Sequence, residues 1–232
     1  MPKLRAKFKK DARLKYIGHL DLIRLFQRTF RKANIPVEYS QGYNPHPKFS
    51  LATALALGIP SDGEYMDIEL TDNMDIDDFI TNMNNSLPRG VKILDADYTN
   101  DKKSLMALIK WSSYIIELFM MEEISKEEVN NKIENILSKD EILMTKTKKK
   151  RGKIRTREVN IRENIYNIDL LIKEDNRIVL KTLLKTGSSG NLKPEDLVKS
   201  LHKEGLNILE NEFNIQRLEL FTEYNGKITK PL

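Results

Sequence analysis

The chain has 232 residues, of which 40% are hydrophobic, with 39 Lys and Arg, 34 Asp and Glu, one Trp and no Cys. This length allows one or two domains, and this composition excludes disorder over most of the chain. The lack of cysteine excludes disulfides, zinc fingers, thiol catalysis and cysteine-bound iron–sulfur clusters. No run approaches the roughly 18 apolar residues of a membrane span, and the N-terminus lacks an apolar signal region, so we expect a cytoplasmic protein.

The net charge of +5 conceals two basic segments. Residues 1–35 carry a local net charge of +9, and residues 146–157 carry +8, so the rest of the chain stands at −12. Two focused basic patches on an acidic protein can attract a polyanion. The candidate partners are RNA, DNA, an anionic membrane surface or an acidic protein face. The alternative for 146–157 is a solvated lysine-rich loop without a partner.

The first 98 residues predict the order strand, helix, strand, strand, helix, strand. The helix over 19–33 has an apolar stripe of Leu22, Phe26 and Phe30 at four-residue spacing. Two prolines, a glycine and an asparagine favour a shaped loop over 40–48. We expect the strands over 2–9, 49–57, 64–70 and 91–98, and the second helix over 75–87.

The second half repeats this scheme with one additional strand, after a linker at 99–111. A helix over 125–138 begins with a capping box of Ser125 and Glu128. We expect the strands over 114–121, 141–147, 155–173, 177–185 and 217–224, and a second helix over 194–203. The sequence thus predicts an α+β protein with two tandem ferredoxin-like (split βαβ) domains and antiparallel sheets, 1–98 and 112–232, the second with a basic insertion at 146–157.

The start of the first helix is the first candidate site. His19 and Asp21 lie in its first turn, where Asp21 suits the positive end of the helix dipole and where a phosphate could also bind. Arg24, Arg28 and Arg31 share the face opposite the apolar stripe. This face is either an ordinary exposed surface with salt bridges or an arginine comb for phosphates.

The loop at 41–48 is the second candidate site. An aromatic ring, an amide, an imidazole and an ammonium lie close together in it: Tyr43, Asn44, His46 and Lys48. Such a set suits stacking and hydrogen bonding to single-stranded RNA, although a rigid turn covering the core would also explain it. His46 could meet His19 and Asp21 in a two-His-one-carboxylate metal set. Because no H-x-x-x-H spacing supports a metal, we predict neither a metal nor a cofactor.

The basic segment is the third candidate. Its proposed phosphate ligands are Lys148, Lys149, Lys150, Arg151, Lys153 and Arg155. The glycine-containing loop at 187–191 fits neither the Walker A nor the GxGxxG pattern, so we interpret it as a flexible turn. We assign no catalytic role to His202.

Two of these motifs resemble a known family. The helix start Gly18-His19-Leu20-Asp21 and the loop Ser40-Gln41-Gly42-Tyr43-Asn44-Pro45-His46-Pro47 are similar to those of the bacterial radical-SAM-linked family of unknown function. The segments 190–197 and 216–220 resemble its C-terminal part. The chain departs from that pattern at Gly18 (usually Ser) and Tyr43 (usually Phe). The resemblance implies a radical SAM protein as a partner, and without cysteine the chain cannot be the radical enzyme itself.

Three hypotheses follow. The leading one is an accessory module that binds tRNA or rRNA for a modification or processing enzyme. The second is a metal-free RNA-processing or RNA-modifying enzyme that uses His19 and His46 as acid and base, with Asp21 as a further candidate. The third is a protein-only adaptor that docks a radical SAM subunit. The tandem layout also looks like CRISPR RNA-processing proteins and some pseudouridine synthases, which is an analogy of fold alone.

Overall fold

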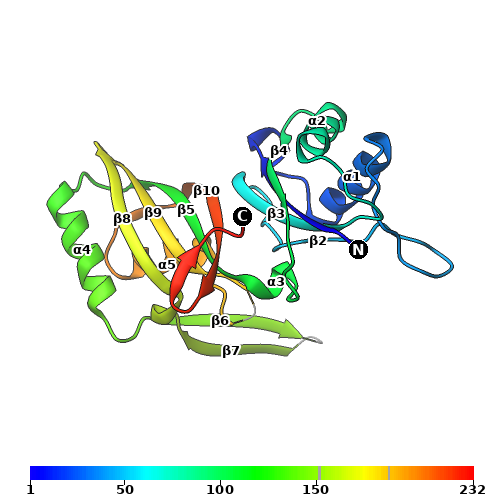
Figure 1. Ribbon diagram of the computed structural model, residues 1–232. Helices are drawn as coiled ribbons and strands as arrows, with labels where there is room; N and C mark the ends of the chain where they lie inside the picture. The colour runs from blue at the N-terminus through cyan, green and yellow to red at the C-terminus, as the bar shows by residue number, and fades with distance from the viewer. Residues whose placement is uncertain (151–152, 188) are drawn as a thin grey trace. The chain divides into compact units, whose positions relative to one another are not determined.

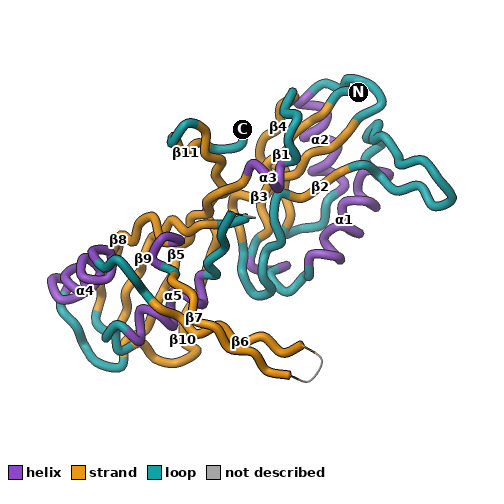
Figure 2. The backbone as a smooth tube through the Cα atoms, turned by 90° about the horizontal axis from the view of Figure 1, so that it is seen from below, coloured by secondary structure: helices purple, strands orange, loops and turns teal. Residues whose placement is uncertain are grey.

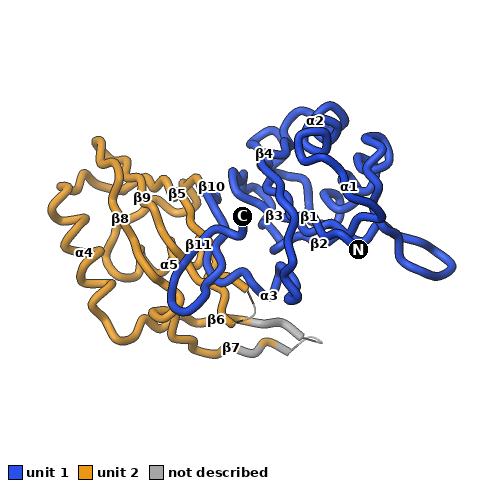
Figure 3. Tube along the Cα trace, viewed as in Figure 1, with its two compact units in different colours: residues 1–111, 216–232 blue, residues 112–215 orange. Residues whose placement is uncertain are grey.

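The computed structural model describes the backbone of residues 1–150, 153–187 and 189–232, and their side chains except those of 148–150, 153 and 155. The protein is α+β, with mostly antiparallel strand pairs and few helices. It divides into two compact units: unit 1 is 1–111 with 216–232, and unit 2 is 112–215 (Figure 3). Two strands, β5 (Ile109–Met120) and β10 (Ile208–Tyr224), each pass from one unit into the other.

Unit 1 is built on a sheet in the order β4-β1-β3, and both β2 and the C-terminal part of β10 pair with β3. The pairs β1–β3, β1–β4 and β2–β3 are antiparallel. Its other elements are β1 (Lys3–Lys10), α1 (His19–Lys32), β2 (Phe49–Leu51), β3 (Ser61–Glu69), α2 (Ile76–Ser86), β4 (Val91–Tyr98), α3 (Leu105–Leu108) and β11 (Lys227–Thr229), shown in Figure 1.

One face of this sheet is apolar and is covered by α1 and α2 (Figure 1). The stripe on α1 is buried, with Phe26 fully covered and its ring centroid 5.0 Å from that of Phe8 on β1. Asp75 begins α2 by accepting hydrogen bonds from the backbone N–H groups of Asp77 and Asp78. Each fully buried side chain of this size contributes about 1.5–3 kcal/mol to stability.

The opposite face of the same sheet carries buried ion pairs. Because side chains alternate along a strand, Arg5 points away from the apolar face. Its Nε donates to Asp67 Oδ1 at 2.8 Å and its Nη1 donates to Asp101 Oδ2 at 2.8 Å. Burial alone would lower the pKa of Arg5, but the hydrogen bonds and charges of Asp67 and Asp101 outweigh it and raise that pKa.

A second buried pair joins β3 to β10 in unit 1. Arg217 Nη1 lies 2.8 Å from Glu64 Oε1, and both side chains are 5% exposed. Close by, Gly63 faces the backbone of Leu218 so tightly that an added Cβ would lie 2.6 Å from its carbonyl oxygen. This contact fixes glycine at that position of β3.

Unit 2 is built on a sheet in the order β10-β5-β9-β8, with β8 antiparallel to β9. Its other elements are α4 (Lys126–Ser138), β6 (Leu143–Lys150), β7 (Lys153–Asn160), β8 (Ile165–Glu174), β9 (Arg177–Lys185) and α5 (Pro194–Lys203), shown as a tube in Figure 2. The predicted capping box of Ser125 and Glu128 is confirmed, because both of its hydrogen bonds are present.

The basic segment lies in a hairpin rather than in the domain sheet. We expected 141–147 to be a strand of that sheet, but β6 pairs with β7 in a separate two-stranded sheet. The expected strand over 155–173 is also wrong, since a 3-10 turn (Arg162–Asn164) divides it into β7 and β8. Arg162 holds this turn by donating from Nε to the Leu137 carbonyl at 3.0 Å and from Nη1 to the Ile165 carbonyl at 2.8 Å.

The boundaries of the units also differ from the expected domains, 1–98 and 112–232. Residues 216–232 lie in unit 1, because β10 continues past unit 2 and Arg217 pairs with Ser61 on β3. The expected linker at 99–111 contains α3 and the start of β5, and its Leu105 and Ile109 are fully buried. Among the described residues, no helix is long and apolar enough to cross a membrane.

Candidate nucleic-acid interface

The exposed face of α1 carries the predicted arginines. Arg24 forms an exposed ion pair with Asp21, with Nη1 and Oδ1 3.0 Å apart. Arg28 and Arg31 are exposed and, within the described part of the chain, have no acidic partner within salt-bridge distance. Lys32, which the sequence analysis did not select, is exposed in the same way. The face therefore offers cations that the fold itself does not use.

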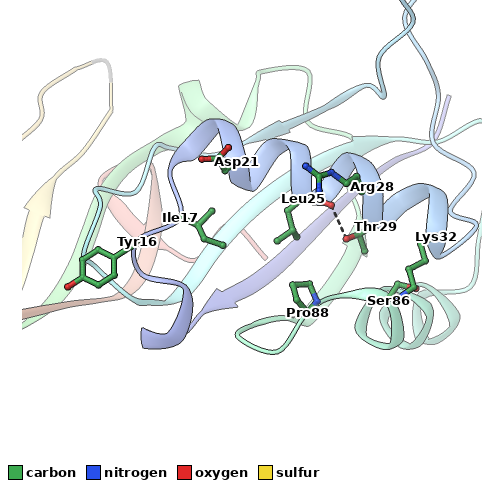
Figure 4. A pocket seen from close by; sticks show the side chains of 9 residues that line it. All are labelled: Tyr16, Ile17, Asp21, Leu25, Arg28, Thr29, Lys32, Ser86 and Pro88. Carbon is green, nitrogen blue, oxygen red and sulfur yellow. Dashed lines mark hydrogen bonds between the residues drawn. The ribbon is translucent and has the colours of Figure 1, made fainter.

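A groove of about 530 Å³ runs beside α1, toward the turn that follows α2 (Figure 4). Ile17, Leu25 and Pro88 give it apolar walls. In Figure 4, Asp21 and Lys32 lie toward opposite ends of α1, with Arg28 between them. We call this feature the α1 groove.

A second groove of about 300 Å³ adjoins the first, because Pro88 lines both. Its cationic residues are Lys9, Arg13, Arg89 and Lys92. Its one carboxylate, Asp11, is bound by Arg13, with Oδ2 and Nη2 2.6 Å apart, and this hydrogen bond lowers the pKa of Asp11. We call this feature the Pro88 groove.

Together the two grooves hold six cations and two carboxylates, and each carboxylate already pairs with an arginine. Sequence reasoning missed the Pro88 groove. This groove depends on a contact between residues far apart in the chain, in which the Asp11 N–H donates to the Gly90 carbonyl at 2.8 Å. Gly90 has a φ of +109°, and a Cβ there would lie 2.8 Å from Leu14. The paired strands β1 and β4 thus bring their cations together.

The loop predicted at 41–48 is the end of a narrow two-stranded arm, residues 38–48. Its strands exchange backbone hydrogen bonds, from Ser40 N–H to the His46 carbonyl at 2.9 Å and from Lys48 N–H to the Glu38 carbonyl at 2.7 Å. Tyr43, Asn44 and His46 are exposed near its tip. Lys48, at its base, lies 3.6 Å from Glu38 and 3.7 Å from Glu69, so it is partly engaged within the fold.

His19 and His46 do not come together. His19 begins α1 after the Lys10 end of β1, whereas the base of the arm bonds to Glu69 at the other end of β3. In the β1–β3 register, Lys10 faces Ser61 and Lys3 faces Glu69, so the two ends are about 23 Å apart at 3.3 Å per residue. The described residues also contain no group of three or more His, Cys, Asp or Glu side chains placed to hold a metal. This corrects the expectation that His19, Asp21 and His46 could share one site.

Unit 2 has a basic groove of its own, of about 650 Å³, between β6 and α5. Lys146, Lys193, Lys199 and Lys203 line it, and its one carboxylate, Asp196, lies 3.9 Å from Lys146. We call it the α5 groove. Sequence reasoning missed the three lysines on and before α5 because only the packing of β6 beside that helix brings them near the basic hairpin.

The remaining candidates are the basic residues at 148–155, His202 and the loop at 187–191. The side chains of Lys148, Lys149, Lys150, Arg151, Lys153 and Arg155 lie outside the described residues. His202 accepts a hydrogen bond at Nδ1 from the Ile208 N–H at 3.2 Å, which is a structural contact. In the loop at 187–191, Ser188 lies outside the described residues.

Several solved structures have a similar fold. A chain of a Cbf5-Nop10-Gar1 complex matches with a TM-score of 0.50 and 10% identity, covering 94% of this chain and 48% of that one. A chain of an H/ACA RNP bound to a substrate RNA containing 2'-deoxyuridine matches with a TM-score of 0.50 and 9% identity, covering 96% and 47%. This chain therefore spans about half the length of those it matches. At this identity the likeness concerns the fold alone.

No curated protein matches the sequence. A family model does match, over residues 3–194, and it describes an uncharacterized protein conserved in bacteria. That match covers most of the chain, and it includes α1, the arm and both strands of the basic hairpin. The protein therefore belongs to the family of uncharacterized proteins conserved in bacteria known as DUF2344.

Proposed function

We propose that this protein binds RNA, with unit 1 as the principal contact surface. The observation that carries the proposal is the pair of adjoining grooves in unit 1. Their six cations outnumber two carboxylates that arginines already engage. Cations of this kind attract the phosphate backbone without regard to sequence. The α5 groove of unit 2 adds a second set of lysines for the same purpose.

The structural likeness agrees with this proposal. Two of the similar structures are an H/ACA RNP bound to a substrate RNA and an archaeal box H/ACA sRNP complex. The strand orders β4-β1-β3-β2 and β10-β5-β9-β8 further support the interpretation that each unit is ferredoxin-like. In this interpretation the β6–β7 hairpin is an insertion in the second domain.

RNA binding against salt tests the proposal. Pooled tRNA and rRNA fragments are titrated with the protein at several salt concentrations, and log K is plotted against log [salt]. The Arg28→Gln/Lys32→Gln variant should lower the steepness of this plot by about 1.4, since each lost contact to a single-stranded phosphate removes about 0.7. The matched control is Lys102→Gln/Lys103→Gln, which removes two exposed charges that line none of these grooves. A flat salt response of the intact protein contradicts the proposal.

The radical SAM partner and the choice of tRNA or rRNA rest on the resemblance and on the leading hypothesis. We propose that the RNA is presented to such an enzyme. Affinity capture of the full chain from native cells, with and without nuclease treatment, tests this partner. Recovery of a radical SAM protein supports the proposal, and repeated recovery of none contradicts it.

A further inference from the structure

We infer that the α1 groove binds an unpaired stretch of RNA, so that the protein prefers single-stranded over double-stranded RNA. This inference rests on the proposed function and names its substrate class. The Asp21–Lys32 stretch of α1 spans eleven residue steps, or about 16 Å at 1.5 Å per residue. The lining residues of the groove therefore follow one face of the helix over this length, as contact with an extended chain requires.

The lining of the groove separates two kinds of chemistry. Ile17, Leu25 and Pro88 are apolar, while Arg28 and Lys32 bring positive charge along one helix face. Thr29 uses its hydroxyl within the helix, donating to the Leu25 carbonyl at 2.9 Å. The apolar wall is suited to the faces of bases and the cations to phosphates. In a duplex the bases are stacked inside and the phosphates lie outside, so only an unpaired strand presents both to one groove.

Tyr16 supplies an aromatic ring at the Asp21 end of the groove. It is 75% exposed, so its ring is open to solvent. Lys15 Nζ lies 5.2 Å from the centroid of its ring. A ring held in this way near a basic groove is the kind of platform on which bases stack regardless of sequence. We therefore place the first base of the bound strand against Tyr16.

The experiment measures the affinity of the protein for two labelled RNAs at one salt concentration. One is a 12-nucleotide single strand of mixed sequence, and the other is the blunt RNA duplex of the same sequence. The intact protein should bind the single strand at least ten-fold more tightly. Tyr16→Ala should weaken single-strand binding about five-fold or more and leave duplex binding unchanged. Tyr16→Phe, which keeps the ring, should retain the affinity. Tyr224→Ala is the matched control, because Tyr224 is also in unit 1 and is also 75% exposed.

The outcomes separate this inference from the proposed function. If the duplex binds as tightly as the single strand, or if Tyr16→Ala behaves like Tyr224→Ala, the inference is overturned while RNA binding stands. If neither RNA binds, the proposed function fails and the inference fails with it. Thermal unfolding of each variant shows that a loss of binding is not a loss of folding.

Discussion

Unit 1 and unit 2 have sheets of the same strand order, but they place their charged residues differently. In unit 1, the pairs Arg5–Asp67 and Arg217–Glu64 are buried, with no side chain more than 8% exposed. In unit 2, every ion pair of the described residues includes a side chain that is a third or more exposed, as in Arg177–Glu117. Sheets with the same strand order thus carry buried ion pairs in unit 1 and partly exposed ion pairs in unit 2.

The grooves differ in the same way. The α1 groove of unit 1 combines apolar walls, an aromatic ring and two cations, whereas the α5 groove of unit 2 is lined by four lysines and three hydroxyl groups, with Leu143 and Met144 beside them. Both grooves have cations for phosphates, but among their described lining residues only the α1 groove has an aromatic ring on which a base can stack. We conclude that the side chains that line each groove decide what it can bind.

The largest effect is expected from the buried pair of unit 1. Arg5→Met leaves the Asp67 carboxylate buried without its main partner, which should cost about 3–5 kcal/mol of unfolding free energy. Arg177→Met in unit 2 should have a much smaller effect, because solvent already screens that pair. Denaturant unfolding measures both, with circular dichroism for the whole chain and the single tryptophan, Trp111, for unit 1. The double variant Arg5→Met/Asp67→Leu should recover much of the lost stability, and equal losses for Arg5→Met and Arg177→Met would contradict the comparison.

The next effect concerns the lysines of unit 2. Lys199→Gln/Lys203→Gln should lower the steepness of the salt plot for RNA binding by about 1.4, as two phosphate contacts are lost. Because we assign the contact with unpaired bases to Tyr16 and the α1 groove, the preference for single-stranded RNA should not change. Combined with Arg28→Gln/Lys32→Gln, the two losses should add. A combined variant no weaker than either pair alone would show that the grooves do not act on the same RNA.

The smallest effect is a pH dependence within unit 1. Burial lowers the pKa of Lys10, and Arg217 lowers it further, although Glu64 opposes this. Between the lowered folded pKa and the ordinary value near 10.5, the unfolded chain binds more protons, so stability from this residue rises with pH in that window. Lys10→Met removes this gain. From pH 8 to 10, the denaturant midpoint of the intact protein should therefore rise relative to that of Lys10→Met. A constant difference between the two midpoints would argue against a buried charge at Lys10.

Sequence reasoning located the features that neighbouring residues determine. The apolar stripe of α1 and the capping box of α4 follow from spacings of three or four residues, and both are present. The arginines on α1 were identified for the same reason. Their partners in the α1 groove were not, because Pro88 lies far from them along the chain. Pro88 comes near these arginines only in the folded protein, in which β1 pairs with β4.

The hairpin and the buried ion pairs illustrate the same limit. Residues 141–147 have a strand pattern, but nothing local shows that β6 pairs with β7 and not with the domain sheet. Arg5 and Asp67 are separated by 62 residues, so their pairing depends on the β1–β3 register. The local signal for a buried ion pair was the alternation of charged residues, such as Arg5, with apolar residues along β1. This alternation predicts a buried ion pair only if the face of the sheet that carries Arg5 is known to be covered.

The central claim is that unit 1 binds RNA through its adjoining grooves. The most direct test is the salt titration of the intact protein beside Arg28→Gln/Lys32→Gln and its charge-matched control, Lys102→Gln/Lys103→Gln. We predict steep salt dependence for the intact protein and the control, and a plot that is shallower by about 1.4 for the groove variant. Identical plots for all three proteins would contradict the assignment of the grooves, and no binding by any of them would contradict RNA binding itself.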